Sequence, residues 1–354
     1  MPFLTGAFGN PGSKHLLGYQ ARDAVQKARR QIAECLGCHP KEIIFTSGAT
    51  ESNNLAVKSG CMSRAHVGRH IITSQIEHSS VLDTCRALED EGFSVTYLRP
   101  NQAGLIEIAK ITEAIRQDTI LLSFMLVNNE IGTINPIAEI SALAKEHGIL
   151  FHCDAAQGLG RLPIDVDTLG VDLMSFTAHK IYGPKGVGAL YIRNAANSLL
   201  KPLQHGGGQE FGFRSGTLNV PGIVGLGTAV LIAMQKRETE TARILLLREA
   251  LHKQLLEVFP HCVVNGCLKR RVAGNLNVAF PGLPAEEIML AIGPSLAVST
   301  SAACMQASAS ASHVLQGIGL SDDLANASIR FGIGRFNTLE EIKEFGINWV
   351  LVPK

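Results

Sequence analysis

The sequence predicts an α/β fold with a mostly parallel, mixed sheet, and three observations carry this prediction. Short apolar runs alternate with amphipathic stretches through the first two-thirds of the chain. Glycine is abundant, at 35 residues, whereas aromatic residues make up only 5%, which suits tight turns between strands and helices. The length of 354 residues, with 46% hydrophobic content, leaves room for about two domains.

The apolar runs predict buried strands separated by helical stretches. We expect helices from about Thr50 and over residues 80–91. This alternation indicates a parallel or mixed sheet with helices on both faces, in which ligands bind at the carboxyl ends of the strands. The predicted strands are residues 42–46, 70–73, 94–98, 119–127, 148–153, 172–176 and 188–192.

A long helical pattern from residue 221 to about residue 260 predicts a connector between two domains. We expect a large domain over residues 1–234 and a smaller C-terminal α/β domain over residues 235–354. The smaller domain includes residues 299–312, which are mostly Ser and Ala and too small and polar to build a core.

Charge and hydropathy exclude several classes of protein. The net charge of +1 provides no overall field for nucleic acid or for acidic membranes. The longest mostly apolar run, residues 223–234, is shorter than the roughly 18 residues of a membrane span. The first residues lack the basic and apolar segments of an export signal, so the eight cysteines indicate reduced thiols. We therefore expect a cytoplasmic protein.

The first candidate site is the turn Thr46-Ser47-Gly48-Ala49-Thr50-Glu51-Ser52, between a predicted strand and a predicted helix. A glycine turn that opens a helix exposes unpaired N–H groups, and the hydroxyls beside it complete a phosphate-binding cup. The turn is not a Walker A loop, so ATP is not implied. The alternative is an ordinary helix start, capped by Thr50 or Ser52.

Asp154 and Lys180 are the second and third candidates, each at the end of a predicted strand. The carboxylate can pair with a cationic ring nitrogen, and the lysine can form a Schiff base if desolvation lowers its pKa. They lie 26 residues apart, close to the length of one βαβ unit, so both could stand at the same edge of adjacent or near strands. The alternatives are a helix-capping aspartate and a solvated surface lysine.

A phosphate cup, an aspartate for a pyridinium nitrogen and a lysine for an aldehyde are together what pyridoxal 5′-phosphate requires. His78, which follows a predicted strand, has a ring suited to stacking on the cofactor. Taken alone, such a histidine is more often structural.

Cys304 lies among small polar residues, which favours an exposed, reactive thiol over a packing role. The alternative is an incidental thiol in a flexible loop. Cys35 and Cys38 have the spacing of a redox or metal pair, but only His39 is nearby and no second pair follows. We interpret them as an incidental pair at a helix end, and we expect no metal.

Seven segments, in order along the chain, resemble the cysteine desulfurases, which are fold-type I pyridoxal-phosphate enzymes of the aminotransferase class V group. The likeness runs from about Phe8 to Glu341. The segments are Phe45 to Asn54, Val127 to Gly132, Cys153 to Gln157, Ala178 to Gly186, Gly206 to Glu210, Arg214 to Thr217 and Ser328 to Phe331.

The resemblance implies a role for each matching residue. Lys180 would bind the cofactor aldehyde, Asp154 the ring nitrogen and Arg330 the substrate carboxylate, while Cys304 would take the sulfur. His78 would stack on the ring. The remaining implied contacts are Asn129 and Gln157 at the ring substituents, Ala49, Thr50, Thr177 and His179 at the phosphate, and Thr217 at the phosphate of the other subunit of a homodimer.

The implied activity converts L-cysteine to L-alanine and leaves sulfur on Cys304 as a persulfide. The acceptor would be an iron–sulfur scaffold protein or a tRNA-thiolation relay. Two alternatives remain: a selenocysteine lyase on the same scaffold, or a shortened, cofactor-poor protein that only binds a partner or dimerises. A nicotinamide-binding fold is disfavoured because no G-x-G-x-x-G opens a helix after the first strand.

Overall fold

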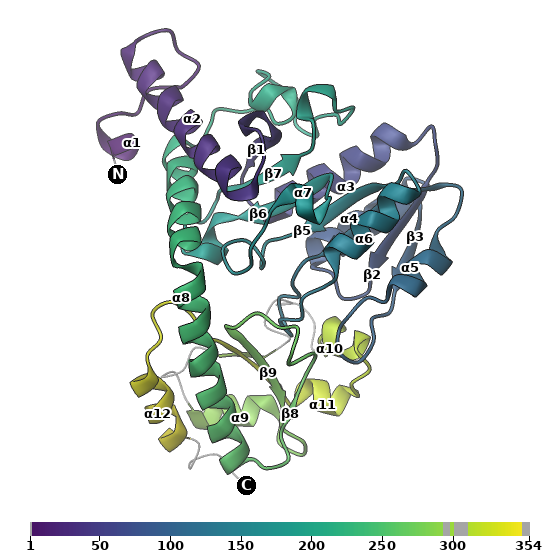
Figure 1. The fold of residues 1–354 in the computed structure, drawn as a ribbon, viewed down its shortest axis with the longest axis vertical. Helices are drawn as coiled ribbons and strands as arrows, with labels where there is room; N and C mark the ends of the chain where they lie inside the picture. Colours follow the sequence, from purple (N-terminus) through teal and green to yellow (C-terminus); the bar gives the residue numbers. More distant parts are fainter. Residues whose placement is uncertain (1, 293–297, 301–310, 349–354) are drawn as a thin grey trace. The chain divides into compact units, whose positions relative to one another are not determined.

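The computed structural model describes residues 2–292, 298–300 and 311–348, which form two compact units (Figure 1). Unit 1 comprises residues 1–98, 108–126 and 136–236, and unit 2 comprises residues 99–107, 127–135 and 237–354. The sequence predicted a single division between residues 234 and 235. In the structure two earlier segments, residues 99–107 and 127–135, also belong to unit 2. They belong there because their backbones bond to unit 2, as in the bridge between Thr133 and Arg271.

The sheet of unit 1 has seven strands in the order β1-β7-β6-β5-β4-β2-β3. Six strands run parallel to one another and β7 is antiparallel to both of its neighbours, so the predicted mixed sheet is confirmed. The strands are β1 (Ile43–Thr46), β2 (His70–Ser74), β3 (Ser94–Leu98), β4 (Thr119–Met125), β5 (Leu150–Asp154), β6 (Leu173–Thr177) and β7 (Gly188–Ile192).

Two strand boundaries differ from the prediction by two residues, both for local reasons. β4 ends at Met125 rather than at residue 127, because the segment from residue 127 belongs to unit 2. β5 begins at Leu150 rather than at residue 148, because Gly148 turns the chain with a positive φ of 64°.

The helices of unit 1 cover both faces of its sheet. Crossovers through α3 and α4 run toward β3, whereas those through α5, α6 and α7 run the opposite way. Because such crossovers are right-handed, the two groups lie on opposite faces. The helices are α1 (Pro2–Thr5), α2 (Leu16–Leu36), η1 (Pro40–Glu42), α3 (Ala49–Arg64), α4 (Ser79–Asp90), α5 (Ile108–Ala114), α6 (Ile137–Glu146), α7 (Val166–Leu169), η2 (Ala178–Ile181), η3 (Ala195–Asn197), η4 (Glu210–Gly212) and the first part of α8 (Val220–Val258).

Unit 2 is built on an antiparallel sheet in the order β10-β11-β9-β8. Leu247, Leu251 and Leu255 lie four residues apart on the later part of α8, so one helix face packs into the core with Leu276 and Ile329. Its other elements are β8 (Val263–Val264), β9 (Asn275–Ala279), α9 (Ala285–Ile292), β10 (Ser299–Thr300), α10 (His313–Gly317), α11 (Asp322–Asn326), β11 (Ser328–Gly332) and α12 (Leu339–Asn348).

The cysteine pair Cys35 and Cys38 lies at the end of α2. Gly37 ends the helix in a left-handed conformation, with φ of 69°, and the N–H of Cys38 donates to the carbonyl of Ala33. Burial, together with the nearby charge of Glu42, raises the pKa of the Cys38 thiol to about 12. Among the described residues, no cluster of three or more His, Cys, Asp or Glu side chains could hold a metal ion.

No helix in the described ranges is long and apolar enough to cross a membrane.

Gly188 allows three strands to meet closely, and we expect any side chain there to destabilise the protein. A Cβ at this position would lie 2.5 Å from the carbonyl oxygen of Phe176 and 2.7 Å from Cα of Gly48. Gly188→Ala should therefore lower the free energy of unfolding by about 1–3 kcal/mol, measured by urea denaturation.

Gly332→Ala is the matched control, since Gly332 also lies in a strand, β11, but a Cβ there meets nothing within 4 Å. It should leave the unfolding midpoint unchanged or slightly raised. Equal destabilisation by both substitutions would refute the steric argument.

Candidate active site

The predicted site residues of unit 1 gather at one edge of its sheet. β1, β5 and β6 run in the same direction, so their last residues, Thr46, Asp154 and Thr177, end at the same edge. The register agrees, because Thr46 and Thr177 both pair with Gly188 of β7, while Asp154 pairs with Ser175. This edge is where parallel sheets bind ligands.

Asp154 is a buried carboxylate, 5% exposed, held by neutral donors. Its Oδ2 accepts a hydrogen bond from Nδ2 of Asn53 at 2.8 Å, and its Oδ1 accepts one from the N–H of Ala156 at 2.9 Å. Burial raises the pKa of Asp154, although these two bonds and the nearby charges of His78 and Lys180 oppose the rise. The carboxylate therefore favours a cation beside it.

His78 begins helix α4, and this fixes its ring. Its Nδ1 accepts from the N–H of Ser80 at 3.1 Å and lies 2.8 Å from the Ser80 hydroxyl. The hydroxyl of Ser80 also accepts from Asn53, so one chain of hydrogen bonds links His78 to Asp154. The ring itself is exposed.

Lys180 lies on η2, directly after β6, with an exposed side chain. Its charge acts to lower the pKa of Asp154, against the larger effect of burial. The backbone carbonyl of Lys180 accepts from Nη2 of Arg161 at 3.3 Å. Arg161 also donates to the carbonyl of Gln157 at 3.2 Å and to Oε1 of Gln157. Sequence reasoning missed this arginine, which joins two predicted residues.

At the cup, the turn that precedes α3, no side chain caps the N-terminus of this helix. Its N-cap residue is Gly48, so the alternative that Thr50 or Ser52 caps this helix is wrong. Ser52 Oγ lies 2.8 Å from Oγ1 of Thr46 instead. N–H groups in a first helical turn have no partner within the helix, which leaves those of Ala49 and Thr50 available to an anion.

Two further predicted phosphate ligands, Thr177 and His179, lie beside the cup. A Cβ on Gly48 would come 3.7 Å from Oγ1 of Thr177, which places this hydroxyl next to the turn. The same oxygen lies 3.0 Å from Nδ1 of His179 and donates to the carbonyl of Val187 at 3.3 Å. Burial, with the charges of Lys180 and Lys185, lowers the pKa of His179.

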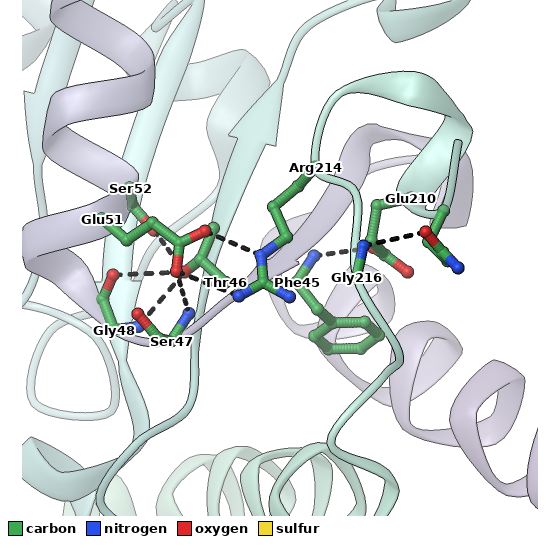
Figure 2. Close-up of polar contacts among 10 residues, drawn as sticks. Phe45, Thr46, Ser47, Gly48, Glu51, Ser52, Glu210, Arg214 and Gly216 are labelled. Atoms are coloured by element: carbon green, nitrogen blue, oxygen red, sulfur yellow. Dashed lines mark hydrogen bonds and ion pairs between the residues drawn. The ribbon is translucent and has the colours of Figure 1, made fainter. Parts of the chain in front are cut away.

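Figure 2 shows a second segment, residues 209–216, that bonds to both sides of the cup. Arg214 contacts Glu51 in the first turn of α3, and Glu210 accepts from the N–H of Phe45 in β1. These partners lie more than 160 residues apart in sequence. All four residues lie in segments that resemble the cysteine desulfurases, but nothing in the sequence indicates which of their side chains pair.

Together these features fit pyridoxal 5′-phosphate. An uncapped helix N-terminus beside hydroxyls suits a phosphate, and a buried carboxylate without a full countercharge suits a protonated ring nitrogen. An exposed lysine whose charge reaches that carboxylate suits an aldehyde.

In unit 2, Arg330 of β11 is held by two acceptors. Its Nη1 donates to the carbonyl of Asn129 at 3.0 Å and its Nη2 donates to Oγ of Ser299 at 2.8 Å. The predicted residues Asn129 and Arg330 are thus brought together by this unit. Thr217 is exposed, after Gly216. Cys304 lies outside the described residues.

Comparison with known proteins agrees over nearly the whole chain. The aminotransferase class-V family matches residues 1–345. A protein named cysteine desulfurase IscS from Anaeromyxobacter dehalogenans (strain 2CP-C) is 50% identical over 343 residues, which cover 97% of this chain and 85% of that protein. Another protein of that name, from Pseudomonas aeruginosa (strain LESB58), is 51% identical over 340 residues, covering 96% and 84%.

Solved structures confirm the predicted fold-type I architecture. A NifS-like protein has a TM-score of 0.92 and 36% identity, over 98% of this chain and 92% of that one. A structure described as SspA in complex with cysteine has a TM-score of 0.85 and 41% identity, over 95% and 94%. The chain therefore belongs to the aminotransferase class V family of pyridoxal-phosphate enzymes and, within it, to the cysteine desulfurases.

Proposed function

We propose that this desulfurase moves sulfur from L-cysteine to the thiol of Cys304, giving L-alanine and a Cys304 persulfide. The step balances: the bond between Cβ and sulfur of the substrate breaks, a sulfur–sulfur bond forms at Cys304, and a proton replaces sulfur on Cβ. The observation that carries the proposal is the buried carboxylate of Asp154, which shares the carboxyl edge of one sheet with Lys180 and the cup.

Pyridoxal phosphate, when bound, withdraws electrons from the substrate Cα and so makes its proton acidic. We assign its ring nitrogen to Asp154 and its aldehyde to Nζ of Lys180, with His78 stacked on the ring and Gln157 at a ring substituent. The phosphate is assigned to the N–H groups of Ala49 and Thr50 and to the side chains of Thr177 and His179.

Lys180 has a second task in this proposal, which is to move a proton. With the cofactor and substrate bound, Nζ of Lys180 would act as the base that removes the proton from the substrate Cα. Its exposed position after a sheet strand leaves it room to act both as nucleophile and as base. The hydrogen bond that Arg161 donates to the backbone carbonyl of Lys180 holds the Lys180 backbone in place.

Arg330 is assigned to the substrate carboxylate, which it would bind in a bidentate pair. Its two hydrogen bonds, to the carbonyl of Asn129 and to Ser299, fix the plane of the guanidinium group. Since a guanidinium has five N–H donors, three remain for substrate. Asn129 is assigned a supporting role at cofactor and substrate.

The choice of Cys304 rests partly on the other thiols. Cys61, Cys85 and Cys153 are buried, and burial raises the pKa of each, to about 12 for Cys85. A thiol must ionise to attack sulfur, so these three are unsuited to the reaction. Cys304 lies in residues 299–312, a stretch in which ten of the fourteen residues are Ser or Ala.

The setting of the enzyme is also proposed. We place it in the cytoplasm, on the cysteine content, and assign it a homodimer in which Thr217 reaches the phosphate of the partner subunit. Sulfur would pass to an iron–sulfur scaffold or to a tRNA-thiolation relay. Two relatives that are 50% and 51% identical to this chain carry the name cysteine desulfurase IscS. They favour the cysteine desulfurase activity over a selenocysteine lyase and over a non-catalytic protein.

Lys180→Ala should abolish covalent attachment of the cofactor, because no other amine is assigned to its aldehyde. After borohydride reduction, peptide mass spectrometry should find the cofactor on Lys180 in the unaltered protein and on no peptide of the variant. Alanine production should fall roughly a thousandfold or more. Lys185→Ala is the matched control, and label on any residue other than Lys180 would overturn the assignment.

Cys304→Ala should stop persulfide formation while leaving cofactor binding intact, because this thiol is the proposed sulfur acceptor. Intact-protein mass spectrometry after incubation with L-cysteine should show one added sulfur, located on Cys304 and absent from the variant. Cys262→Ala should still gain it. A variant that lacks Cys304 yet forms alanine from L-selenocysteine at full rate would favour the lyase instead.

Asp154→Asn should change the apoprotein and the holoprotein in opposite directions. Removing a buried charge is expected to stabilise the apoprotein by about 1–2 kcal/mol, because Asn53 can turn its amide to bond with the new side chain. Affinity for pyridoxal phosphate should fall about tenfold or more. Thermal unfolding with and without cofactor measures both, and destabilisation of the apoprotein would contradict the argument.

A further inference from the structure

Glu51 places a carboxylate in the first turn of the helix assigned to the cofactor phosphate. It is the third residue of α3, and its Oε2 accepts from the N–H of Ser47 at 2.8 Å. Partial burial acts to raise the pKa of Glu51, but hydrogen bonds from Arg214 and Ser47 outweigh it and lower the pKa. The side chain is thus anionic at neutral pH.

Arg214 neutralises this carboxylate from a distant part of the chain. Its Nε donates to Oε1 of Glu51 at 2.8 Å and its Nη2 donates to Oε2 at 3.4 Å (Figure 2). The side chains are 21% exposed for Arg214 and 17% for Glu51, so solvent screens the pair less than it screens a surface pair.

The segment that carries Arg214 is itself fixed to the strand before the cup. Both oxygens of Glu210 accept from Arg29, at 2.6 and 2.9 Å, and Oε2 also accepts from the N–H of Phe45 at 2.7 Å. Both side chains of this ion pair are almost fully buried. Arg214 is therefore presented to Glu51 from a backbone that is anchored four residues earlier.

An anion-binding turn that contains an anionic side chain poses a problem of charge. Glu51 orients the cup through the N–H of Ser47, yet its charge repels a phosphate bound at the same turn. A cation paired with Glu51 removes the repulsion and leaves the orienting hydrogen bond intact. Arg214 meets both requirements.

We propose that Arg214 is a positioning residue that sets the affinity of the cup for the cofactor phosphate by neutralising Glu51. The inference rests on the proposed function, because it takes the cup as the phosphate site. It assigns a role to a side chain that touches neither substrate nor cofactor in that proposal.

A charge cycle of three variants tests it: Arg214→Gln, Glu51→Gln and the double variant. Arg214→Gln leaves an uncompensated carboxylate and should weaken binding of pyridoxal phosphate to the apoenzyme roughly tenfold. Glu51→Gln should bind equally or more tightly, and the double variant should return near the affinity of the unaltered protein. Fluorescence titration with pyridoxal phosphate, and competition by inorganic phosphate, measure these affinities without turnover.

The outcomes separate failure of the inference from failure of the proposed function. If Arg214→Gln weakens binding and Glu51→Gln does not restore it, Arg214 acts through loop structure and the charge argument is overturned. If inorganic phosphate does not compete and no variant changes the affinity, the cup is not the phosphate site.

Arg116 and Asp118 provide a matched control pair. Their side chains are 48% and 46% exposed, and the pair precedes β4, at the opposite edge of the sheet. Arg116→Gln, Asp118→Asn and their combination should leave cofactor affinity unchanged. A tenfold loss in Arg116→Gln would mean that any change of protein charge affects binding, which would overturn a local role for Arg214.

Discussion

The buried carboxylate of Asp154 is the constraint on which the rest of the site depends. At the end of β5 it loses water, and the donors that replace water, Asn53 and Ala156, carry no charge. Burying an ion costs several kcal/mol unless a countercharge compensates it, and the nearby charges of His78 and Lys180 oppose the effect of burial only in part. In the proposed function a protonated ring nitrogen would offset that cost, so cofactor binding and the stability of this edge would be coupled through one side chain.

Two further carboxylates prepare the neighbouring cup before any ligand arrives. Glu210 accepts a hydrogen bond from the N–H of Phe45, and Glu51 accepts one from the N–H of Ser47. The first fixes the backbone before Thr46 and the second fixes the backbone after it. The chain bears strain to do this, since Glu210 and Phe211 have positive φ angles of 50° and 58°. Such conformations cost of order 1–3 kcal/mol each and persist where the surroundings require them. Here the ion pair between Glu210 and Arg29 holds this backbone conformation in place.

The sequence predicted the strands of unit 1 and the shared edge of Asp154 and Lys180, because both follow from local pattern. Apolar runs mark buried strands, and parallel strands bring their carboxyl ends together. It did not predict that Arg214 pairs with Glu51, or Arg29 with Glu210, because these contacts join residues 163 and 181 positions apart. Nor did it place residues 99–107 and 127–135 in unit 2, since membership there comes from backbone pairing and not from composition.

Several of the residues assigned to the site are held by hydrogen bonds. His78 is fixed by Ser80, Thr177 by the carbonyl of Val187, and Arg330 by Asn129 and Ser299. Binding groups fixed in advance lose little freedom when ligand arrives. The proposed function sets a different requirement for Lys180, because a group that bonds to the cofactor and later moves a proton must change position. Its side chain is exposed and its backbone carbonyl accepts a hydrogen bond from Arg161, so the proposed movement of Nζ would take place on a backbone that is held.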